Sequence, residues 1–168
     1  MSQKELLNFE SIRYFAARYP DLDFSAIEAC VYLHRLTMEL EAAFDAHFGR
    51  HDLSRGRFMI LIMLMRQNGG GLAPAELAEA CGVTRATVTG LLDNLEASEL
   101  VTRTQKAGDR RGVEILLTPK GLARMEGLMP DHYQRITAMM ALLSRDEQGQ
   151  LVELLRKVRQ GIPKVAVP

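Results

Sequence analysis

The chain lacks three features that would assign it at once to a large class of proteins. It has no continuous apolar run of roughly 18 residues, which a membrane-spanning helix needs, and no secretory signal pattern. It has two cysteines, far apart in 168 residues, so no disulfide framework is expected. Its 21 basic residues balance 21 acidic ones, so the whole chain is not a polycation. We therefore expect a cytoplasmic protein of one or two domains with no membrane partner.

The chain also lacks the residue groups that carry catalysis. No Ser/His/Asp, Cys/His or paired-carboxylate arrangement has a supporting motif, and there are four histidines. Three consecutive glycines at 69–71 are not followed by the Gly-Lys-Ser/Thr of a phosphate-binding loop, so they predict a flexible connector. We expect a protein that is not an enzyme and holds no cofactor.

Two short helices separated by a glycine are predicted between residues 74 and 98. Pro74 suits the first position of a helix, because its missing N–H would be unpaired there in any case, and Gly82 ends that helix. Thr84 suits the N-cap of a second helix, which begins at Arg85. The apolar residues that recur at helical spacing in the second helix are Val88, Leu91, Leu92 and Leu95. This pattern is typical of a helix-turn-helix, whose second helix can enter the DNA major groove.

A basic hairpin is predicted directly after the second helix. Residues 100–104 and 113–117 are short strand-like runs, and the loop between them contains glycines and three basic residues. Between residues 101 and 124, six basic residues stand against two acidic ones, a net charge of +4. DNA binding needs a basic face rather than a basic protein. The hairpin is therefore interpreted as the wing of a winged helix-turn-helix.

The sequence of this wing resembles one particular family. D-R-R-G-V-E-I-L-L-T-P-K-G, which starts at Asp109, is similar to the signature of the multiple-antibiotic-resistance regulator (MarR) family. L-L-D-N-L-E-A-S-E-L-V-T-R, which ends at Arg103, resembles the recognition helix and first wing strand of that family. The resemblance covers roughly residues 25 to 160. One departure is Gly90, which stands where some relatives have Arg, so one base contact of those relatives is not expected here.

The resemblance implies a mainly α-helical fold with a small β-hairpin wing, which binds double-stranded operator DNA. It gives Arg111 the role of entering the minor groove and Asp109 that of bracing the neighbouring arginines. On the second helix, small side chains would let the backbone approach while Arg and Asn read base edges. The alternative is an ordinary solvent-exposed helix face and turn. The residues expected at the DNA are Arg85, Ala86, Thr87, Thr89, Gly90, Asn94, Arg103, Lys106, Asp109, Arg110 and Arg111.

Amphipathic helices are predicted on both sides of the winged domain. They cover residues 3–18, Asp23 or Ser25 to about Phe48, a segment that begins at Ser54, one that begins at Thr118-Pro119, and Ser144 to about Gln160. Pro130 lies inside the fourth of these helices and is expected to kink or split it. The expected domains are dimerisation helices at 1–52, a winged domain at 53–118 and further dimerisation helices at 119–168.

The helices at the two ends carry more apolar surface than a small winged domain can cover, so a homodimer is expected. In the MarR family such helices interlock into a dimer with two DNA-binding lobes. The alternative is a monomeric helical domain.

Cys30 is a candidate redox switch. It lies 24 residues before Ser54, as the sensing cysteine does in the organic-hydroperoxide-responsive branch of the family. However, Phe44 and Arg55 stand where that branch has tyrosines. The alternative, which we favour, is a small buried hydrophobe, and we expect the same of Cys81.

His47 and His51 have the four-residue spacing that binds zinc on one helix face. Gly49 between them is expected to end the helix and break that face. We therefore expect no metal site.

A site for a small-molecule effector is expected between the dimer core and the winged domain. Apolar surface beside a few polar groups is typical of such sites, and His34 and Arg57 would orient an anionic or phenolic ligand. The predicted lining residues are His34, Met38, Arg57, Phe58, Ile62 and Met125. The effector expected is an aromatic acid or a similar lipophilic anion, and the alternative is a filled core with no cavity.

The function predicted from these patterns is a dimeric transcriptional repressor that an effector releases from a pseudo-palindromic operator. One alternative is a repressor that senses oxidants through Cys30. Another is a winged-helix module that binds protein and not DNA. A third is a metal- or redox-dependent enzyme, which would need a bound cofactor.

Overall fold

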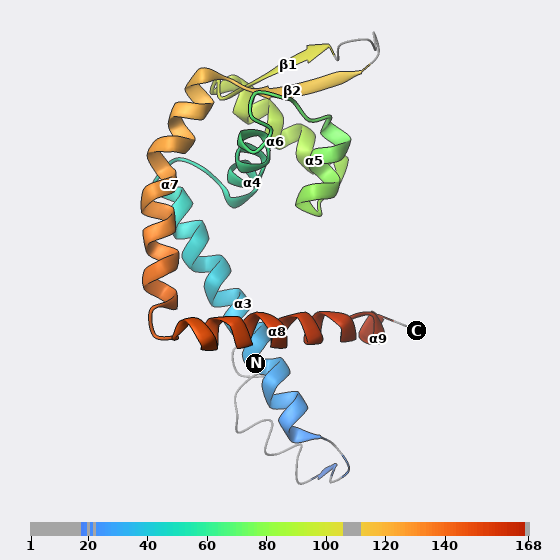
Figure 1. Cartoon of the computed structure of the whole chain (residues 1–168). Coiled ribbons are helices and arrows are strands. Elements are labelled where there is room, and N and C mark those ends of the chain that lie inside the picture. The colour runs from blue at the N-terminus through green and yellow to red at the C-terminus, as the bar shows by residue number, and fades with distance from the viewer. Residues whose placement is uncertain (1–17, 20, 22, 106–111, 167–168) are drawn as a thin grey trace.

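A compact winged lobe sits at one end of long helices in the computed structural model (Figure 1). The structure describes residues 18–19, 21, 23–105 and 112–166. The helix predicted over residues 3–18 lies outside the described residues, except for Arg18. The mainly α-helical fold with a two-stranded hairpin is confirmed.

Two helices precede the winged motif, and both begin at predicted caps. Helix α3 (Phe24–Gly49) begins after Asp23, whose carboxylate accepts a hydrogen bond from the Ala26 N–H at 3.1 Å. Helix α4 (Arg55–Met65) begins after Ser54, whose hydroxyl accepts from the Arg57 N–H at 3.3 Å. Each cap satisfies a backbone donor that the first helical turn leaves without a partner.

The winged motif follows the predicted order, with α5 (Pro74–Cys81), α6 (Arg85–Ala97), β1 (Val101–Gln105) and β2 (Val113–Leu117). Gly82 ends α5 with a left-handed backbone (φ 65°), which glycine adopts without a steric penalty. The strands pair antiparallel, with Val101 opposite Leu117 and Gln105 opposite Val113.

The connector at residues 69–71 is more closely packed than predicted. Leu72, which follows it, makes an isolated antiparallel bridge to Ile115, with hydrogen bonds of 2.9 and 3.1 Å in both directions. A Cβ at Gly71 would lie 2.8 Å from the carbonyl oxygen of Ile115 and would also overlap the side chain of Glu114. At Gly71 the glycine therefore permits a close approach to the wing rather than flexibility.

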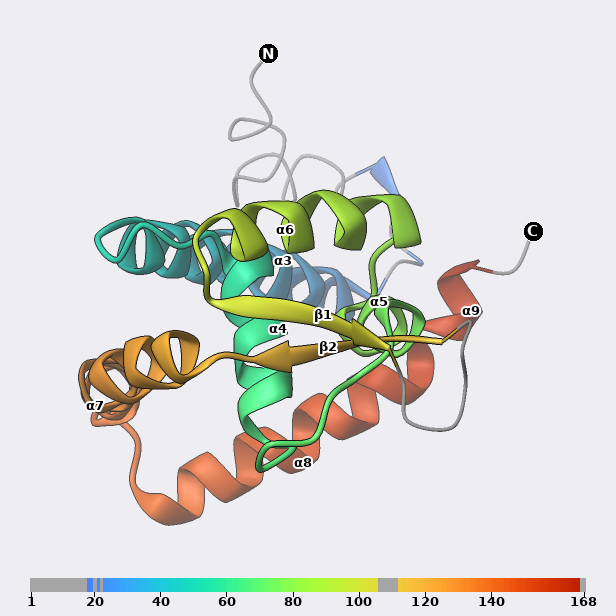
Figure 2. The ribbon, with the colours of Figure 1, turned by 90° about the horizontal axis from the view of Figure 1, so that it is seen from above.

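Helix α4 forms the centre of the lobe and is enclosed by α5, α6, the hairpin and α7 (Pro119–Met140) (Figure 2). Its sequence is apolar almost all round, as expected for a helix with neighbours on every side. The largest fully buried side chains among the described residues are Ile60, Leu61, Leu64, Leu77, Val88, Leu92, Leu95, Ile115, Met125 and Leu128.

Helix α7 is continuous through Pro130, so the expectation of a split is wrong. Pro130 is exposed, and solvent on that side can pair with the backbone carbonyl that its missing N–H leaves free. Ser144 makes the predicted capping box with Glu147 and begins α8 (Arg145–Gly161), which the short α9 (Pro163–Ala166) follows. None of the helices within the described residues combines the length and apolar character needed to cross a lipid bilayer.

We expect Gly121→Ala to destabilise the fold by about 1–3 kcal/mol, the usual cost of overpacking. Gly121 is buried where α7 begins, and a Cβ there would overlap the Leu100 carbonyl oxygen and lie 2.8 Å from Leu117 Cδ1. Gly127→Ala on the same helix is the control, because its Cβ would meet nothing within 4 Å. Urea unfolding at one protein concentration measures both changes, and equal midpoints for the two variants would contradict this packing.

Candidate nucleic-acid interface

Helix α6 exposes the face that the sequence assigned to DNA. Its apolar residues Val88, Leu92 and Leu95 are buried in the lobe. The six residues of α6 predicted at the DNA are all exposed: Arg85, Ala86, Thr87, Thr89, Gly90 and Asn94. A helix that is fixed on one face and bears small polar side chains on the other has the form needed to lie in a major groove.

Local hydrogen bonds hold several of these side chains against the helix. The Thr84 hydroxyl accepts from the Thr87 N–H at 3.1 Å, and the Thr89 hydroxyl donates to the Arg85 carbonyl at 3.0 Å. The Asn94 amide donates to the Gly90 carbonyl at 2.7 Å. Because these side chains lie against the helix, they project little from the outer surface of α6.

Arg103, which was also predicted at the DNA, is paired with two acidic residues of α6. Its guanidinium forms ion pairs with Asp93 at 2.5 Å and Glu96 at 3.1 Å, and the first of these bonds raises the pKa of Arg103. Its backbone N–H also donates to Glu96 at 3.3 Å. Arg103 therefore ties strand β1 to α6 and fixes the wing relative to the recognition helix.

The wing itself extends from the lobe as a pair of strands (Figure 1). The residues predicted at its tip are Lys106, Asp109, Arg110 and Arg111, and they lie outside the described residues. Their DNA contacts stay a prediction from the sequence.

An aromatic cluster joins the lobe to the long helices. The rings of Phe48 in α3 and Phe58 in α4 stack with centroids 4.2 Å apart. His132 in α7 lies 5.4 Å from Phe48 and 4.9 Å from Phe58, centroid to centroid. Burial lowers the pKa of His132, so its ring is neutral near pH 7 and can pack against apolar neighbours.

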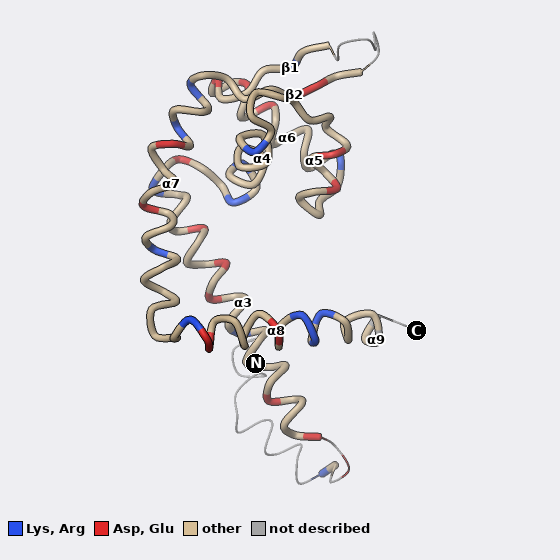
Figure 3. Tube along the Cα trace, viewed as in Figure 1, with Lys and Arg blue, Asp and Glu red and all other residues tan. Residues whose placement is uncertain are grey.

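A second imidazole, His47, stacks on His132 with centroids 5.3 Å apart. His47 is buried, and burial, with the neighbouring His132 second, lowers its pKa. Acidic positions lie along α3, and α7 carries both basic and acidic positions (Figure 3). Where the two helices approach, Asp131 of α7 lies 3.8 Å from His47 Nδ1 of α3. Arg135 pairs with Asp131 at 2.8 Å one turn before it, and this bond lowers the pKa of Asp131.

The structure separates the residues predicted for the effector site. Phe58 and Met125 are buried in the lobe, and Ile62 is packed against that core. His34 and Met38 are exposed on α3. His34 lies fourteen residues before Phe48, which contacts Phe58, and that is about 21 Å along the helix axis. Within one chain these residues do not line one small pocket.

A cavity of about 540 Å³ lies instead between α3 and α7. Apolar side chains line most of it, together with the guanidinium groups of Arg50 and Arg135. Its lining residues are Leu40, Ala43, Phe44, Ala46, His47, Arg50, Arg135, Ile136, Ala138 and Met139. Arg57, the sixth predicted residue, lines a separate cavity beside Lys120 and Arg124.

Cys30 is exposed on α3, so the expectation that it is buried is wrong for the single chain. Phe44, at a position where the redox-sensing branch has tyrosine, stacks on Phe48 at 6.0 Å between centroids. Arg55, at the other such position, pairs with Glu41 at 2.8 Å. Cys81 packs against the lobe, and burial raises the pKa of its thiol, as suits a small hydrophobic residue.

Sequence reasoning did not find the polar residues of the α3–α7 junction. Asp131, His132 and Arg135 stand about 80 residues after His47, and no spacing rule links the two segments. The only signal was that Asp131 and His132 follow Pro130 directly on a helix that was expected to break there.

Comparison with known proteins agrees with this geometry. The sequence model of the MarR family matches residues 51–112. The HTH-type transcriptional repressor YetL of Bacillus subtilis is 34% identical over 155 residues, which cover 92% of this chain and 93% of YetL.

Two solved structures have similar folds. One is the S. aureus MepR–DNA complex, with 28% identity, a TM-score of 0.68, and coverage of 77% of this chain and 96% of MepR. The other is BpsR of Bordetella bronchiseptica, a protein whose DNA binding is regulated by 6-hydroxynicotinic acid. It has 27% identity, a TM-score of 0.66, and coverage of 79% and 98%.

These likenesses set aside the alternatives of an enzyme and of a winged module that binds no DNA. The winged motif, the exposed face of α6 and the relatives lead to one assignment: the chain belongs to the MarR family and is a DNA-binding transcriptional regulator.

Proposed function

We propose that the protein is a homodimeric repressor that an aromatic acid releases from a pseudo-palindromic operator. The observation that carries the DNA contact is the exposed polar face of α6, which Arg103 fixes next to the wing. The similarity to YetL, itself a repressor, supports the sign of regulation.

The dimer is supported by helix α8, which has apolar residues along one side and no buried residue. In Figure 1 it lies at the opposite end of α7 from the lobe and is separated from the lobe. Helices α3 and α7 also expose large apolar side chains, including Leu36, Met38 and Met139. A second copy that interlocks α3, α7 and α8 with their counterparts would cover this surface.

Symmetry then sets the spacing of the DNA half-sites. Two α6 helices related by a two-fold axis would meet successive major grooves about 34 Å apart, which corresponds to half-sites about 10 base pairs apart. Anything that changes the angle between the lobe and the dimerisation helices would change this spacing and weaken binding.

We propose the cavity between α3 and α7 as the effector site that exerts this control. Its volume of about 540 Å³ falls within the range of small-molecule sites, roughly 300–1,000 Å³. Phe44, Ile136 and Met139 would pack on an aromatic ring, while Arg50 and Arg135 would pair with its carboxylate. The regulation of BpsR by 6-hydroxynicotinic acid supports this class of effector. An effector that fits one arrangement of α3 and α7 better than another would shift the population of lobe orientations toward that arrangement.

We expect Gly90→Glu to weaken operator binding by at least about tenfold, or about 1.4 kcal/mol, because a carboxylate on this face would meet DNA phosphates. Gly90→Arg, which adds bulk at the same open position, should bind at least as well as the wild type. Gly127→Glu on α7 is the control for charge alone. Fluorescence anisotropy on a fragment from the upstream region of the gene measures all four proteins. If Glu and Arg at position 90 weaken operator binding equally, the effect is steric and not electrostatic. If Glu does not weaken operator binding, the proposal that α6 contacts DNA is contradicted.

We expect Leu154→Lys combined with Leu155→Lys to convert the dimer to monomer, because each buries a charge in the proposed interface. Gln150→Lys, an exposed polar position on α8, should leave the dimer intact. Sedimentation equilibrium at micromolar concentration gives the mass of each protein. A monomeric wild type would contradict the proposed dimer.

We expect Arg50→Ala to raise at least tenfold the concentration of aromatic acid that releases half of the DNA, because the carboxylate loses one of its two cationic partners. Hydroxybenzoic and hydroxynicotinic acids are the ligands to titrate against the protein–operator complex. His34→Ala and Phe58→Ala are the comparison variants, because they test the effector site that was predicted from the sequence. If His34→Ala loses sensitivity and Arg50→Ala keeps it, the effector binds at the exposed face of α3 instead.

A further inference from the structure

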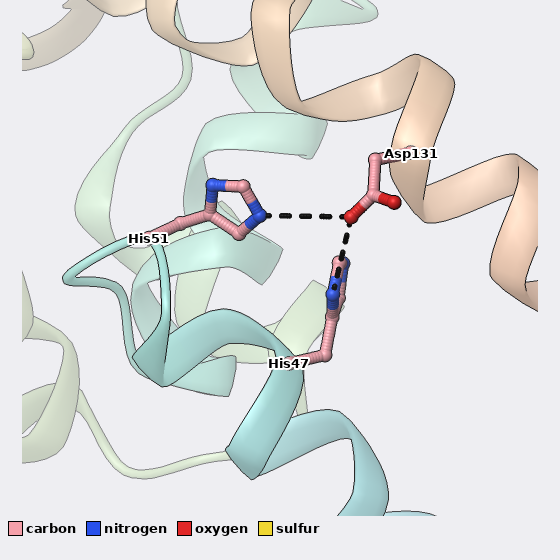
Figure 4. A group of neighbouring side chains, drawn as sticks. All are labelled: His47, His51 and Asp131. Carbon is pink, nitrogen blue, oxygen red and sulfur yellow. Dashed lines mark ion pairs between the residues drawn. The ribbon is translucent and has the colours of Figure 1, made fainter.

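Three side chains that the DNA-binding function does not use converge where α3 approaches the middle of α7 (Figure 4). They are His47 in the last turn of α3, His51 in the turn that follows, and Asp131 in α7. One nitrogen of each imidazole and one carboxylate oxygen lie within 4.8 Å of one another. The Asp131 Oδ2 atom is 3.8 Å from both His47 Nδ1 and His51 Nε2. Helix α3 ends at Gly49, as the sequence predicted, but the turn that follows still brings His51 to the same carboxylate as His47.

The surrounding packing holds each of the three groups in place. His47 is 3% exposed, and its ring lies between His132 and Phe48, with centroid distances of 5.3 and 5.1 Å. Among the described residues, its Nε2 atom has no hydrogen-bond partner, while its Nδ1 atom lies 3.3 Å from the Arg50 guanidinium group and 3.8 Å from Asp131 Oδ2. The packing therefore holds the His47 imidazole in place beside the other two candidate metal ligands, His51 and Asp131.

The other two groups are braced by arginines of α7. Arg135 donates to Asp131 Oδ2 at 2.8 Å and fixes the carboxylate. Arg124 donates to the backbone carbonyl of His51 and fixes the turn that carries the imidazole. Braced ligands of this kind are typical of metal sites, where outer hydrogen bonds orient the groups that bind the ion.

We propose that His47, His51 and Asp131 form a binding site for a divalent transition-metal ion, with Zn²⁺ as the best match. Two imidazole nitrogens and one carboxylate oxygen suit zinc, which binds such ligands at about 2.0–2.2 Å and can take water in a fourth position. Ligands around a tetrahedral ion of that size lie about 3.3 Å apart, so the 3.8 Å separations need only small side-chain movements.

Two cations act against the ion and set its affinity. Arg50 approaches His47 Nδ1 at 3.3 Å, but it is exposed and its long side chain can turn toward solvent. Arg135 donates at 2.8 Å to Asp131 Oδ2, the same oxygen that faces both histidines, so its guanidinium group competes with the ion for that atom. We therefore expect reversible binding at micromolar concentrations rather than the permanent occupancy of a structural zinc.

The ion would join the end of α3 to the middle of α7, the two helices that connect the winged lobe to the proposed dimerisation surface. Its effect on DNA rests on the proposed function, because a fixed α3–α7 angle matters only if that angle sets the spacing of two α6 helices. Metal binding itself does not depend on the dimer or on the operator.

The test is a titration of the full-length, metal-free protein with Co²⁺, followed by competition with Zn²⁺, in the absence of DNA. Tetrahedral Co²⁺ absorbs visible light strongly and reports the ligand set. We expect one ion per chain in the wild type. His51→Gln and Asp131→Asn should bind at least tenfold more weakly. His51 is partly exposed and Asp131→Asn keeps the shape of the side chain, so circular dichroism should show both variants folded.

Two further variants distinguish this site from adventitious binding. His34→Gln removes the exposed histidine of α3 and should bind like the wild type. Arg50→Ala removes the competing cation and should bind more tightly. The proposal is overturned if the wild type binds no ion, or if His51→Gln, Asp131→Asn and the wild type bind alike. Operator binding by the metal-free wild type is measured separately and tests the proposed function alone.

Discussion

The packing of α3, α4 and α7 on one another is the contact on which the rest of the structure depends. Phe48, Phe58 and His132 supply one ring from each helix, and their centroids lie within 5.4 Å of one another. Helix α4 belongs to the winged lobe, whereas α3 and α7 leave it. This cluster therefore contributes directly to the position of the recognition helix relative to α3 and α7. A histidine can serve as the third ring only because burial keeps it neutral.

Most of the fold could be predicted from the sequence because its signals are local. The N-caps of five helices lie at residues that the sequence predicted as helix starts or caps: Asp23, Ser54, Thr84, Thr118 and Ser144. A cap acts on backbone groups within three residues, so its effect does not depend on the rest of the chain. Pro130 shows the limit of the same reasoning. Whether proline breaks a helix depends on what faces the freed carbonyl, and only the tertiary structure shows that this side is exposed.

The candidate sites divide in the same way. The exposed face of α6 follows from which residues are apolar at helical spacing, so the residues predicted to face DNA could be identified from that segment alone. Arg103 could not, because its partners Asp93 and Glu96 are brought near it only when β1 folds back along α6. The spread of the predicted effector residues within one chain also could not be read from local patterns. His34 is exposed in the middle of α3, whereas Phe58 and Met125 are buried in the lobe, and only the tertiary structure shows the distance between them.

The polar groups of the α3–α7 junction have a consequence for control. Arg135 lines the cavity and also holds Asp131, while Arg50 lines the cavity and also approaches His47. An anion in the cavity would draw both guanidinium groups toward itself and lower the positive potential at the histidines and Asp131. A cation beside Asp131 would repel the same guanidinium groups toward the cavity. The two ligands would therefore favour each other's binding, and by linkage the coupling must be equal in both directions. With the proposed effector site and the proposed metal site, the junction would respond to an organic anion and a metal ion together, because Arg50 and Arg135 contribute to both.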